Sequence, residues 1–342
     1  MAVGYAVNAA GAPAPLAERW NGARWIIQAV PAPRGATSSF LFGVSCATAR
    51  TCTAVGSATR HTTGTVALAE RLARDRWTIE RLPRPARRAR REVDYLAAVS
   101  CPRATSCTAV GYAGDAAGTA GRPLAARFTG AHGWAVSTVP IPVATRAAFL
   151  SGVSCPSLQS CAAVGFRTTR AGAQAALAER LTRAGWALEP IPTPAAATAV
   201  QLTGIACASP RACTAAGYFQ AGGIDVLLTE RFDGARWVVG RPRYPAGARE
   251  VQLTDVACPS AVACTAVGSF TDVAGLDQPL AEHWTPRGWT IQSTPTLGTL
   301  ADPVDAPLAG VSCPSPARCV AVGSATPLDG EGQDPISLSW GT

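Results

Sequence analysis

Residues 150–165 of this chain read Leu-Ser-Gly-Val-Ser-Cys-Pro-Ser-Leu-Gln-Ser-Cys-Ala-Ala-Val-Gly. Two short segments of apolar and small residues flank a turn of polar residues, which is the pattern of a β-hairpin. Closely similar stretches recur along the chain, and their last glycine returns every 51 to 55 residues. These glycines are Gly4, Gly56, Gly111, Gly165, Gly217, Gly268 and Gly323. The chain is therefore one array of repeats, and its fold follows from the repeat.

A second hairpin completes each repeat. It reads Leu-Ala-Glu-Arg and one large apolar residue, then a tight turn, then Trp-x-Ile/Val, as in residues 228–239 with a threonine in place of the alanine. Four short strands, here called a to d, in a period near fifty residues without helical periodicity predict a β-propeller blade. We predict an all-β, seven-bladed β-propeller of four-stranded antiparallel blades, formed by one domain. Its repeats span approximately 1–40, 41–95, 96–149, 150–201, 202–252, 253–307 and 308–342.

The first and last repeats are shorter than the others. The first begins at strand b and the last ends after strand c, so we count 26 strands instead of the 28 in seven four-stranded blades. The first blade is expected to lack its inner strand and the last its outer strand. We interpret Met1 as a misplaced start, with a signal peptide, two strands and a thirteenth cysteine, partner to a fourteenth, encoded upstream.

The twelve cysteines form six C-x5-C pairs, one on each side of the predicted a–b turn. A zinc site would need four ligands close in sequence or in space, and the pairs stand about fifty residues apart. We therefore predict disulfides, no metal and an extracellular or cell-envelope location. The predicted bridges are Cys46–Cys52, Cys101–Cys107, Cys155–Cys161, Cys207–Cys213, Cys258–Cys264 and Cys313–Cys319.

Residues 228–245, "LTERFDGARWVVGRPRYP", resemble the corresponding stretch of kelch-type propellers. The repeat as a whole is more similar to uncharacterised secreted bacterial repeat proteins with VSCxSxxxCxAVG and ERWNGxxW motifs. That resemblance implies a propeller but no catalytic residues. Residues 233–237 also resemble part of the Asp-box of sialidase-like propellers, without its leading serine.

Composition narrows the range of partners. All thirty basic residues are arginine, and the net charge is +8. We interpret the arginines as codon bias in a GC-rich genome, so the charge alone does not indicate a polyanionic partner. No apolar stretch reaches the ~18 residues that span a bilayer. We expect no membrane span, no nucleic-acid partner and a monomer.

Ligand recognition is expected on the face that carries the variable b–c and d–a connections, because variable loops on a rigid scaffold commonly carry function. The arginine-rich segment 84–91 is the most charged element of that face, although a solvated loop is its simpler interpretation. No aromatic residue interrupts the segment, so base stacking is not supported. The candidate ligand-binding residues are Arg87, Arg88, Arg90, Arg91, Tyr112, Phe166, Tyr218 and Phe270, the four aromatics being placed at the start of b–c loops.

Other repeated residues are assigned to structure. The tryptophan that opens strand d has a fixed position and is expected between blades. We expect the Glu-Arg pair of strand c to join neighbouring blades, glutamate of one to arginine of the next. The acidic segment 329–334 could wrap calcium, but a flexible loop is the simpler interpretation.

No cofactor motif and no G-x-S-x-G, H-E-x-x-H or P-loop motif occurs. The sequence favours a non-catalytic propeller that binds a glycan or a protein. A glycan-active hydrolase or lyase and a structural module of the cell envelope remain alternatives.

Overall fold

The computed structural model describes residues 1–61, 64–83, 92–115, 117, 120–294, 304–327 and 333–341. The chain divides into two compact units, Met1–Gly172 with Leu177–Glu189 and Ala173–Ala176 with Pro190–Thr342. The regular elements of the described ranges are β-strands. These ranges contain no helix long and apolar enough to cross a membrane.

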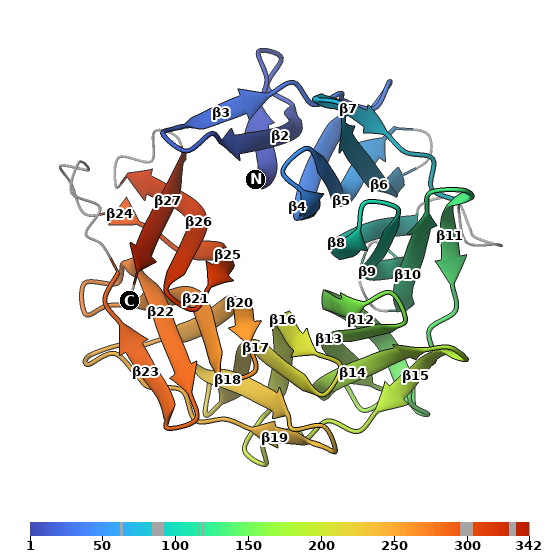
Figure 1. Ribbon diagram of the computed structural model, residues 1–342. Coiled ribbons are helices and arrows are strands. Elements are labelled where there is room, and N and C mark those ends of the chain that lie inside the picture. The colour runs from blue at the N-terminus through green and yellow to red at the C-terminus, as the bar shows by residue number, and fades with distance from the viewer. Residues whose placement is uncertain are drawn as a thin grey trace. The chain divides into compact units, whose positions relative to one another are not determined.

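The first unit contains four antiparallel meanders (Figure 1). The first residues of strand β14, which belongs to the fourth meander, are assigned to the second unit. Meander 1 has three strands in the order β1-β2-β3, and meanders 2 to 4 follow as β4–β7, β8–β11 and β12–β15. Single parallel pairs, Thr65 with Val93 and Gly121 with Ala147, join meanders 2 to 4 into one twelve-stranded sheet. The strands are β1 Ala2–Val7, β2 Pro13–Trp20, β3 Trp25–Gln28, β4 Ser38–Thr48, β5 Thr51–Arg60, β6 Gly64–Ala73, β7 Arg76–Ile79, β8 Glu92–Arg103, β9 Ser106–Asp115, β10 Gly121–Thr129, β11 Gly133–Ser137, β12 Thr145–Ser157, β13 Ser160–Thr169, β14 Gln174–Thr182 and β15 Gly185–Glu189.

The second unit contains three further meanders. Meanders 5 and 6 are the four-stranded sheets β16–β19 and β20–β23, and meander 7 consists of β25–β27 with the short strand β24 beside β26. The strands are β16 Ala199–Ser209, β17 Ala212–Ala221, β18 Ile224–Phe232, β19 Trp237–Val239, β20 Val251–Ser260, β21 Ala263–Thr271, β22 Asp277–Thr285, β23 Gly288–Gln292, β24 Val304–Asp305, β25 Leu308–Ser315, β26 Arg318–Pro327 and β27 Asp334–Gly341.

Strands a and b are longer than the apolar segments that predict them. In meander 4 the pairing of β12 with β13 extends from Ser157 and Ser160 to Thr145 and Thr169. A register shift after Leu150 interrupts the ladder, and equivalent shifts recur in the other meanders that have a first strand. Polar residues near the strand ends therefore pair as regular backbone, which apolar periodicity alone cannot detect.

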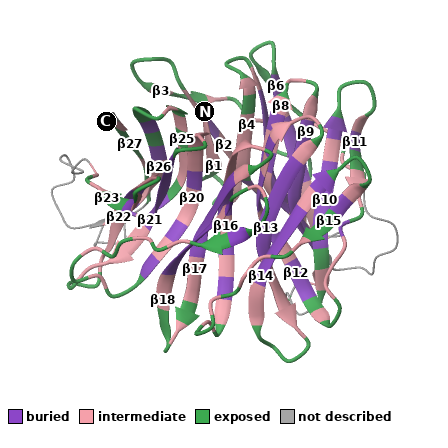
Figure 2. Cartoon of the chain, turned by 60° about the horizontal axis from the view of Figure 1, so that its bottom comes forward, coloured by how far each residue is buried: buried purple, intermediate pink, exposed green. Residues whose placement is uncertain are grey.

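The core lies between the faces of neighbouring meanders rather than within one sheet. In the cluster between meanders 2 and 3, Val55 and Ala69 pack against Leu96, Phe128 and Trp134. Buried residues follow the middle of the strands, and exposed residues gather at the turns (Figure 2). The predicted position of the repeated tryptophan is confirmed, because five of the six are buried and the sixth, Trp25, is half-buried. The buried five are Trp77, Trp134, Trp186, Trp237 and Trp289.

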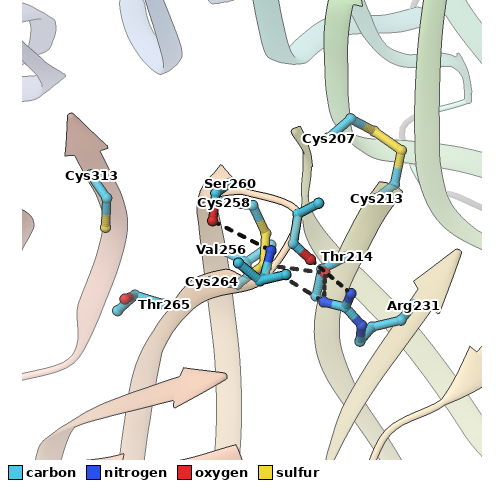
Figure 3. Close-up of a disulfide and its surroundings, with 12 residues drawn as sticks. Cys207, Cys213, Thr214, Arg231, Val256, Cys258, Ser260, Cys264, Thr265 and Cys313 are labelled. Atoms are coloured by element: carbon cyan, nitrogen blue, oxygen red, sulfur yellow. Dashed lines mark hydrogen bonds between the residues drawn. A yellow bond between two sulfur atoms is a disulfide. The ribbon is translucent and has the colours of Figure 1, made fainter. Parts of the chain in front are cut away.

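The six predicted disulfides are all formed, and each closes the turn between strands a and b. Six disulfides indicate an oxidising environment. A threonine of the preceding meander lies beside four of them. The hydroxyl–sulfur distances are 3.4 Å for Thr53–Cys107, 3.6 Å for Thr108–Cys161, 3.4 Å for Thr214–Cys264 and 3.5 Å for Thr265–Cys319. Figure 3 shows Thr214 and Arg231 pointing at Cys264.

The tight turns expected between strands c and d are four-residue loops at residues 21–24 and 233–236. Four residues separate the strands, and Asp233 Oδ1 accepts the N–H groups of Ala235 and Arg236, each at 2.9 Å. These bonds hold the pKa of Asp233 below its usual value. Only the glycine has positive φ, 104° at Gly22 and 97° at Gly234, so these are aspartate- or asparagine-capped loops and not type I′ turns.

Candidate functional site

Three arginines of strand c point to the next meander, but none of their partners there is a glutamate, whereas Arg180 pairs with Glu189 of its own meander at 2.7 Å. Arg71 donates to the carbonyl of Ala104, and Arg127 donates to the carbonyl of Leu158 at 3.3 Å. Arg231 donates to the carbonyl of Ala261 at 3.3 Å. Arg71 also lies over the ring of Phe128 and Arg231 over the ring of Trp284. The predicted glutamate–arginine pairing between meanders is therefore wrong, because the guanidinium binds the a–b turn and an aromatic face instead.

The glutamate of strand c is buried on the opposite face. Glu70, Glu179 and Glu230 are 0% exposed, and their carboxyl oxygens have no hydrogen-bond partner among the described residues. Burial raises the pKa of each of these carboxyls to about 8. An isolated buried carboxylate is strongly unfavourable, so these groups are neutral at pH 7.

Glu282 occupies the same repeat position but has a partner. Both of its carboxyl oxygens accept the backbone N–H of Arg243 at 3.0 Å. This bond opposes the effect of burial, and the pKa of Glu282 is raised only to about 7. Arg243 stands where the other repeats have proline, which has no N–H to donate. Those prolines are Pro31, Pro83, Pro140, Pro192 and Pro295.

Meander 3 departs from this pattern because Ala126 replaces the glutamate. Ala126 is 1% exposed and faces meander 2, where Pro83 takes the place of Arg243. A cavity of about 260 Å³ lies at this interface, and both Ala126 and Pro83 line it. We call it the Ala126 cavity. It is slightly below the ~300–1,000 Å³ of typical small-molecule sites.

The Ala126 cavity combines an apolar wall with charged side chains. Leu68, Leu96, Leu124 and Val136 belong to its wall. Its charged lining residues are Arg60, Glu80, Arg81 and Asp94.

Asp94 and Arg60 are two of these charged lining residues. Asp94 is only 8% exposed, and the Nε of Arg60 is buried without a hydrogen-bond partner in the described part of the chain. The charged lining residues stand at the end of β5, just after β7 and near the start of β8, where the b–c and d–a connections begin and end, and the rest of the lining includes residues of β6, β10 and β11. The cavity can therefore offer both donors and acceptors to a polar ligand.

The predicted site residues are only partly brought together. Segment 84–91, with Arg87, Arg88, Arg90 and Arg91, lies outside the described residues, as do residues 329–332 of the acidic segment. The four predicted aromatics lie inside strands and not at the start of loops, because the a–b ladder extends past them. They are Tyr112, Phe166, Tyr218 and Phe270, of which Tyr112 is buried and the others are half-buried.

Tyr112 and Phe166 belong to a row of stacked rings in the first unit. Phe149 connects them, with ring centroids 4.2 Å from Tyr112 and 4.7 Å from Phe166. Tyr112 also donates its hydroxyl to the carbonyl of Ala120 at 3.0 Å. Its ring is thus a packing element, 2% exposed. The row continues through Tyr95, Phe42, Phe40 and Tyr5, with centroid separations of 4.9 to 6.2 Å.

The sequence carries one signal for the Ala126 cavity. Alanine stands where glutamate recurs, and only the packing of meander 2 on meander 3 reveals that the exchange leaves a cavity. In the described ranges, no three His, Cys, Asp or Glu side chains gather in a way that could hold a metal ion.

No protein-family model matches the chain, and no curated protein matches it. Among solved structures, the BP39L lectin from Burkholderia pseudomallei is similar with a TM-score of 0.53 and 18% identity, over 97% of this chain and 90% of that chain. A protein of unknown function from Dyadobacter fermentans matches with a TM-score of 0.53 and 10% identity, over 89% and 95% of the two chains.

Trypanosoma rangeli sialidase, in complex with 2,3-difluorosialic acid, matches with a TM-score of 0.53 and 8% identity. The match covers 94% of this chain but 56% of the sialidase, so this chain spans little more than half of that enzyme's length. At these identities the similarity shows the fold alone. The chain has an all-β fold that matches β-propeller proteins.

Proposed function

We propose that this protein is an exported seven-bladed β-propeller that binds a glycan in the Ala126 cavity, on the face that carries the b–c and d–a connections. In this proposal meanders 1 to 7 are the blades, and the first and last blades each have three of the four regular strands. The observation that carries the proposal is the exchange of the buried glutamate for Ala126, which opens a cavity lined by two arginines and two carboxylates.

The chemistry of the cavity suits a hydroxyl-rich ligand. Carboxylates accept hydrogen bonds from hydroxyls, and guanidinium groups donate to hydroxyl or ring oxygens in a fixed planar geometry. The leucine and valine side chains of the wall provide the apolar contact that a sugar ring needs on its C–H face. The similarity to a lectin fold agrees with this proposal but does not carry it.

The test is glycan-array binding of the full chain, followed by titration calorimetry with the best glycan. Ala126→Glu restores the repeat residue and fills the cavity, so we expect binding to be lost while the melting temperature stays within a few degrees. Ala126→Gly is the matched control that keeps the cavity and retains binding. Arg60→Ala should weaken binding about tenfold or more, as expected when a charged hydrogen bond is lost. Full binding by Ala126→Glu, or no glycan bound by the wild type, would overturn the proposal.

A second candidate is glycoside hydrolysis, favoured by the presence of two carboxylate residues, Glu80 and Asp94, in the lining of one cavity. Glycosidases place an acid and a base or nucleophile ~5–10 Å apart on either side of the scissile bond. Release of reducing sugar from the bound glycan, abolished by Asp94→Asn and by Glu80→Gln, would support it. Stable glycan binding without release of reducing sugar would contradict hydrolysis and support glycan binding alone.

A further inference from the structure

The disulfides of meanders 6 and 7 have the same form. They are the meander 6 bridge, Cys258–Cys264, and the meander 7 bridge, Cys313–Cys319. In each, the first cysteine is half-buried and the second is buried, with Cys264 2% and Cys319 4% exposed. A threonine hydroxyl of the preceding meander lies beside the buried sulfur, at 3.4 Å from Cys264 and 3.5 Å from Cys319. The two bridges therefore form a matched pair within the second unit.

The two bridges differ in the residue that follows the repeated glutamate of strand c in the preceding meander. For the meander 6 bridge this residue is Arg231, whose Nη1 lies 3.9 Å from the sulfur of Cys264 and donates to Thr214 Oγ1 at 3.0 Å (Figure 3). For the meander 7 bridge it is His283, whose Nδ1 lies 3.5 Å from the oxygen of the equivalent threonine. Arginine is always charged in proteins, whereas histidine loses its charge near neutral pH. Of this pair, only the meander 6 bridge has a permanent positive charge beside its buried sulfur.

Arg231 is held in this position by further contacts. Its Nη2 donates to the carbonyl of Ala261 at 3.3 Å, and its guanidinium lies over the ring of Trp284. The equivalent arginine of meander 4 is bound by Glu189 of its own meander at 2.7 Å. Gly240 takes the place of that glutamate in meander 5 and has no side chain to bind an arginine. Arg231 consequently reaches the disulfide of the next meander.

We propose that the meander 6 bridge is a thiol-exchange site, at which a small thiol is joined to Cys258 and Cys264 is released. The attacking thiolate forms a bond with the sulfur of Cys258, the half-buried cysteine, and the bond between the two cysteines breaks. Its electron pair leaves with Cys264 as a thiolate beside Arg231. A second thiolate attacks the sulfur of the bound thiol. Cys258 is then released as a thiolate, and the two small thiols leave as a disulfide.

The surroundings of Cys264 favour this reaction in three ways. Thiol–disulfide exchange is faster when the leaving sulfur is a better stabilised thiolate, and a nearby arginine stabilises a thiolate. The charge of Arg231 also attracts the anionic attacking thiol. A disulfide sulfur has no proton, so Thr214 is the donor to Cys264 and supports the leaving thiolate. The site does not involve the Ala126 cavity, and its test is therefore independent of glycan binding.

The probe is reduced glutathione, added in excess to the folded full chain at about pH 8, where part of the glutathione is thiolate. Samples are alkylated with iodoacetamide at intervals and digested, and mass spectrometry measures the thiols released from each bridge. We expect the meander 6 bridge to open at least about fivefold faster than the meander 7 bridge, with the glutathione adduct on Cys258. Raising sodium chloride from ~0.05 M to ~1 M should reduce this difference, because salt screens the charge of Arg231.

Exchanging the two matched residues tests the role of the charge. Arg231→His should slow the opening of the meander 6 bridge to the rate of the meander 7 bridge, and His283→Arg should accelerate the latter. A purely structural role of Arg231 predicts the opposite, because losing its bond to Ala261 would loosen the turn and speed up the opening. Melting temperatures within a few degrees of the wild type, without reductant, would show that both variants fold.

The wild type alone can already overturn the proposal, by equal rates for the two bridges or by faster opening of the meander 7 bridge. An unchanged or increased rate in Arg231→His would also overturn it, as would a glutathione adduct on Cys264 instead of Cys258. The chain unfolded in urea is the control, in which both bridges should open at similar rates. A difference of the same size in urea would assign the effect to the local sequence and not to Arg231.

Discussion

The interface of meanders 2 and 3 and the interface of meanders 5 and 6 use the same repeat position in opposite ways. In the second unit, Glu282 fills the interface and accepts the N–H of Arg243 at 3.0 Å. In the first unit, Ala126 faces Pro83 across a cavity of about 260 Å³. Neither interface follows the common repeat, which places glutamate opposite proline. The comparison shows that single departures from the repeat change an interface between meanders. It can hold a hydrogen-bonded glutamate, an unpartnered neutral glutamate, or a cavity.

The common arrangement of glutamate opposite proline is itself unfavourable for a charged carboxylate. Glu70 and Glu179 lie in meanders that follow Pro31 and Pro140, and neither has a hydrogen-bond partner among the described residues. The pKa values of about 8 for these two and about 7 for Glu282 differ in the direction expected from one backbone hydrogen bond.

The largest expected effect is a fall in the free energy of unfolding as rising pH ionises the buried glutamates that are neutral in the folded protein. Unfolded glutamate has a pKa near ~4.3, and burial raises the pKa of Glu70, Glu179 and Glu230 to about 8. Between these values the folded state binds more protons than the unfolded state. The stability that these three carboxyls contribute should therefore be complete below ~pH 4, fall as the pH rises to about 8, and then level off. We expect a loss of at least ~3 kcal/mol between pH 5 and pH 9, measured by urea denaturation.

Asp255 and Glu282 titrate in the same window, because burial raises their pKa values to about 6 and about 7, against the hydrogen bonds from Val311 and Val256 and from Arg243. The control is therefore the triple variant Glu70→Gln, Glu179→Gln and Glu230→Gln, which keeps both Asp255 and Glu282. Its profile should be much flatter than that of the wild type. A wild type with no pH dependence, or a triple variant with the same slope, would refute the assignment of neutral buried carboxyls.

An intermediate effect should distinguish the partnered glutamate from the unpartnered one. Glu282→Ala removes the acceptor of the Arg243 N–H and leaves a cavity, so at pH 7 it should destabilise the fold by about 2–3 kcal/mol. Glu70→Ala removes a carboxyl that has no partner and should cost about 1 kcal/mol or less. Chemical denaturation of both variants measures the difference.

Arg243→Pro is the matched control, because it restores the proline of the other repeats. It should move the pKa of Glu282 from about 7 towards that of Glu70, which NMR titration of the labelled side chain can follow. A larger loss for Glu70→Ala than for Glu282→Ala would contradict the comparison.

The smallest effect concerns the threonines beside the disulfides of the two units. The hydroxyl of Thr53 contacts Cys107, whereas that of Thr214 contacts Cys264 and also accepts a hydrogen bond from Arg231 at 3.0 Å. Thr53→Val should therefore cost about 0.5 kcal/mol and Thr214→Val about 1–1.5 kcal/mol. Thermal unfolding under non-reducing conditions measures both, and equal losses would mean that the Arg231 bond contributes nothing.

The sequence predicts the four strands of the repeat, the disulfides and the burial of the tryptophans because each depends on local chemistry repeated many times. Apolar alternation, glycine spacing and paired cysteines carry that information in every repeat. The extent of strands a and b could not be predicted, since backbone pairing continues through polar residues such as Arg167 and Thr168. The surroundings of Glu70 and Arg71 could not be predicted either, because they are formed by residues of the neighbouring meanders, such as Ala104 for Arg71, that are distant in the sequence.

The sequence alone determines that this chain is an all-β array of repeats stapled by six disulfides, because hydrogen bonding and short disulfide loops act within one repeat. Only the tertiary structure decides what the departures from the repeat do. Whether Ala126 is a harmless variant or opens a cavity depends on the residue of the next sheet that faces it. Packing between sheets brings together residues about fifty positions apart, and a local sequence pattern does not show which of these residues come into contact.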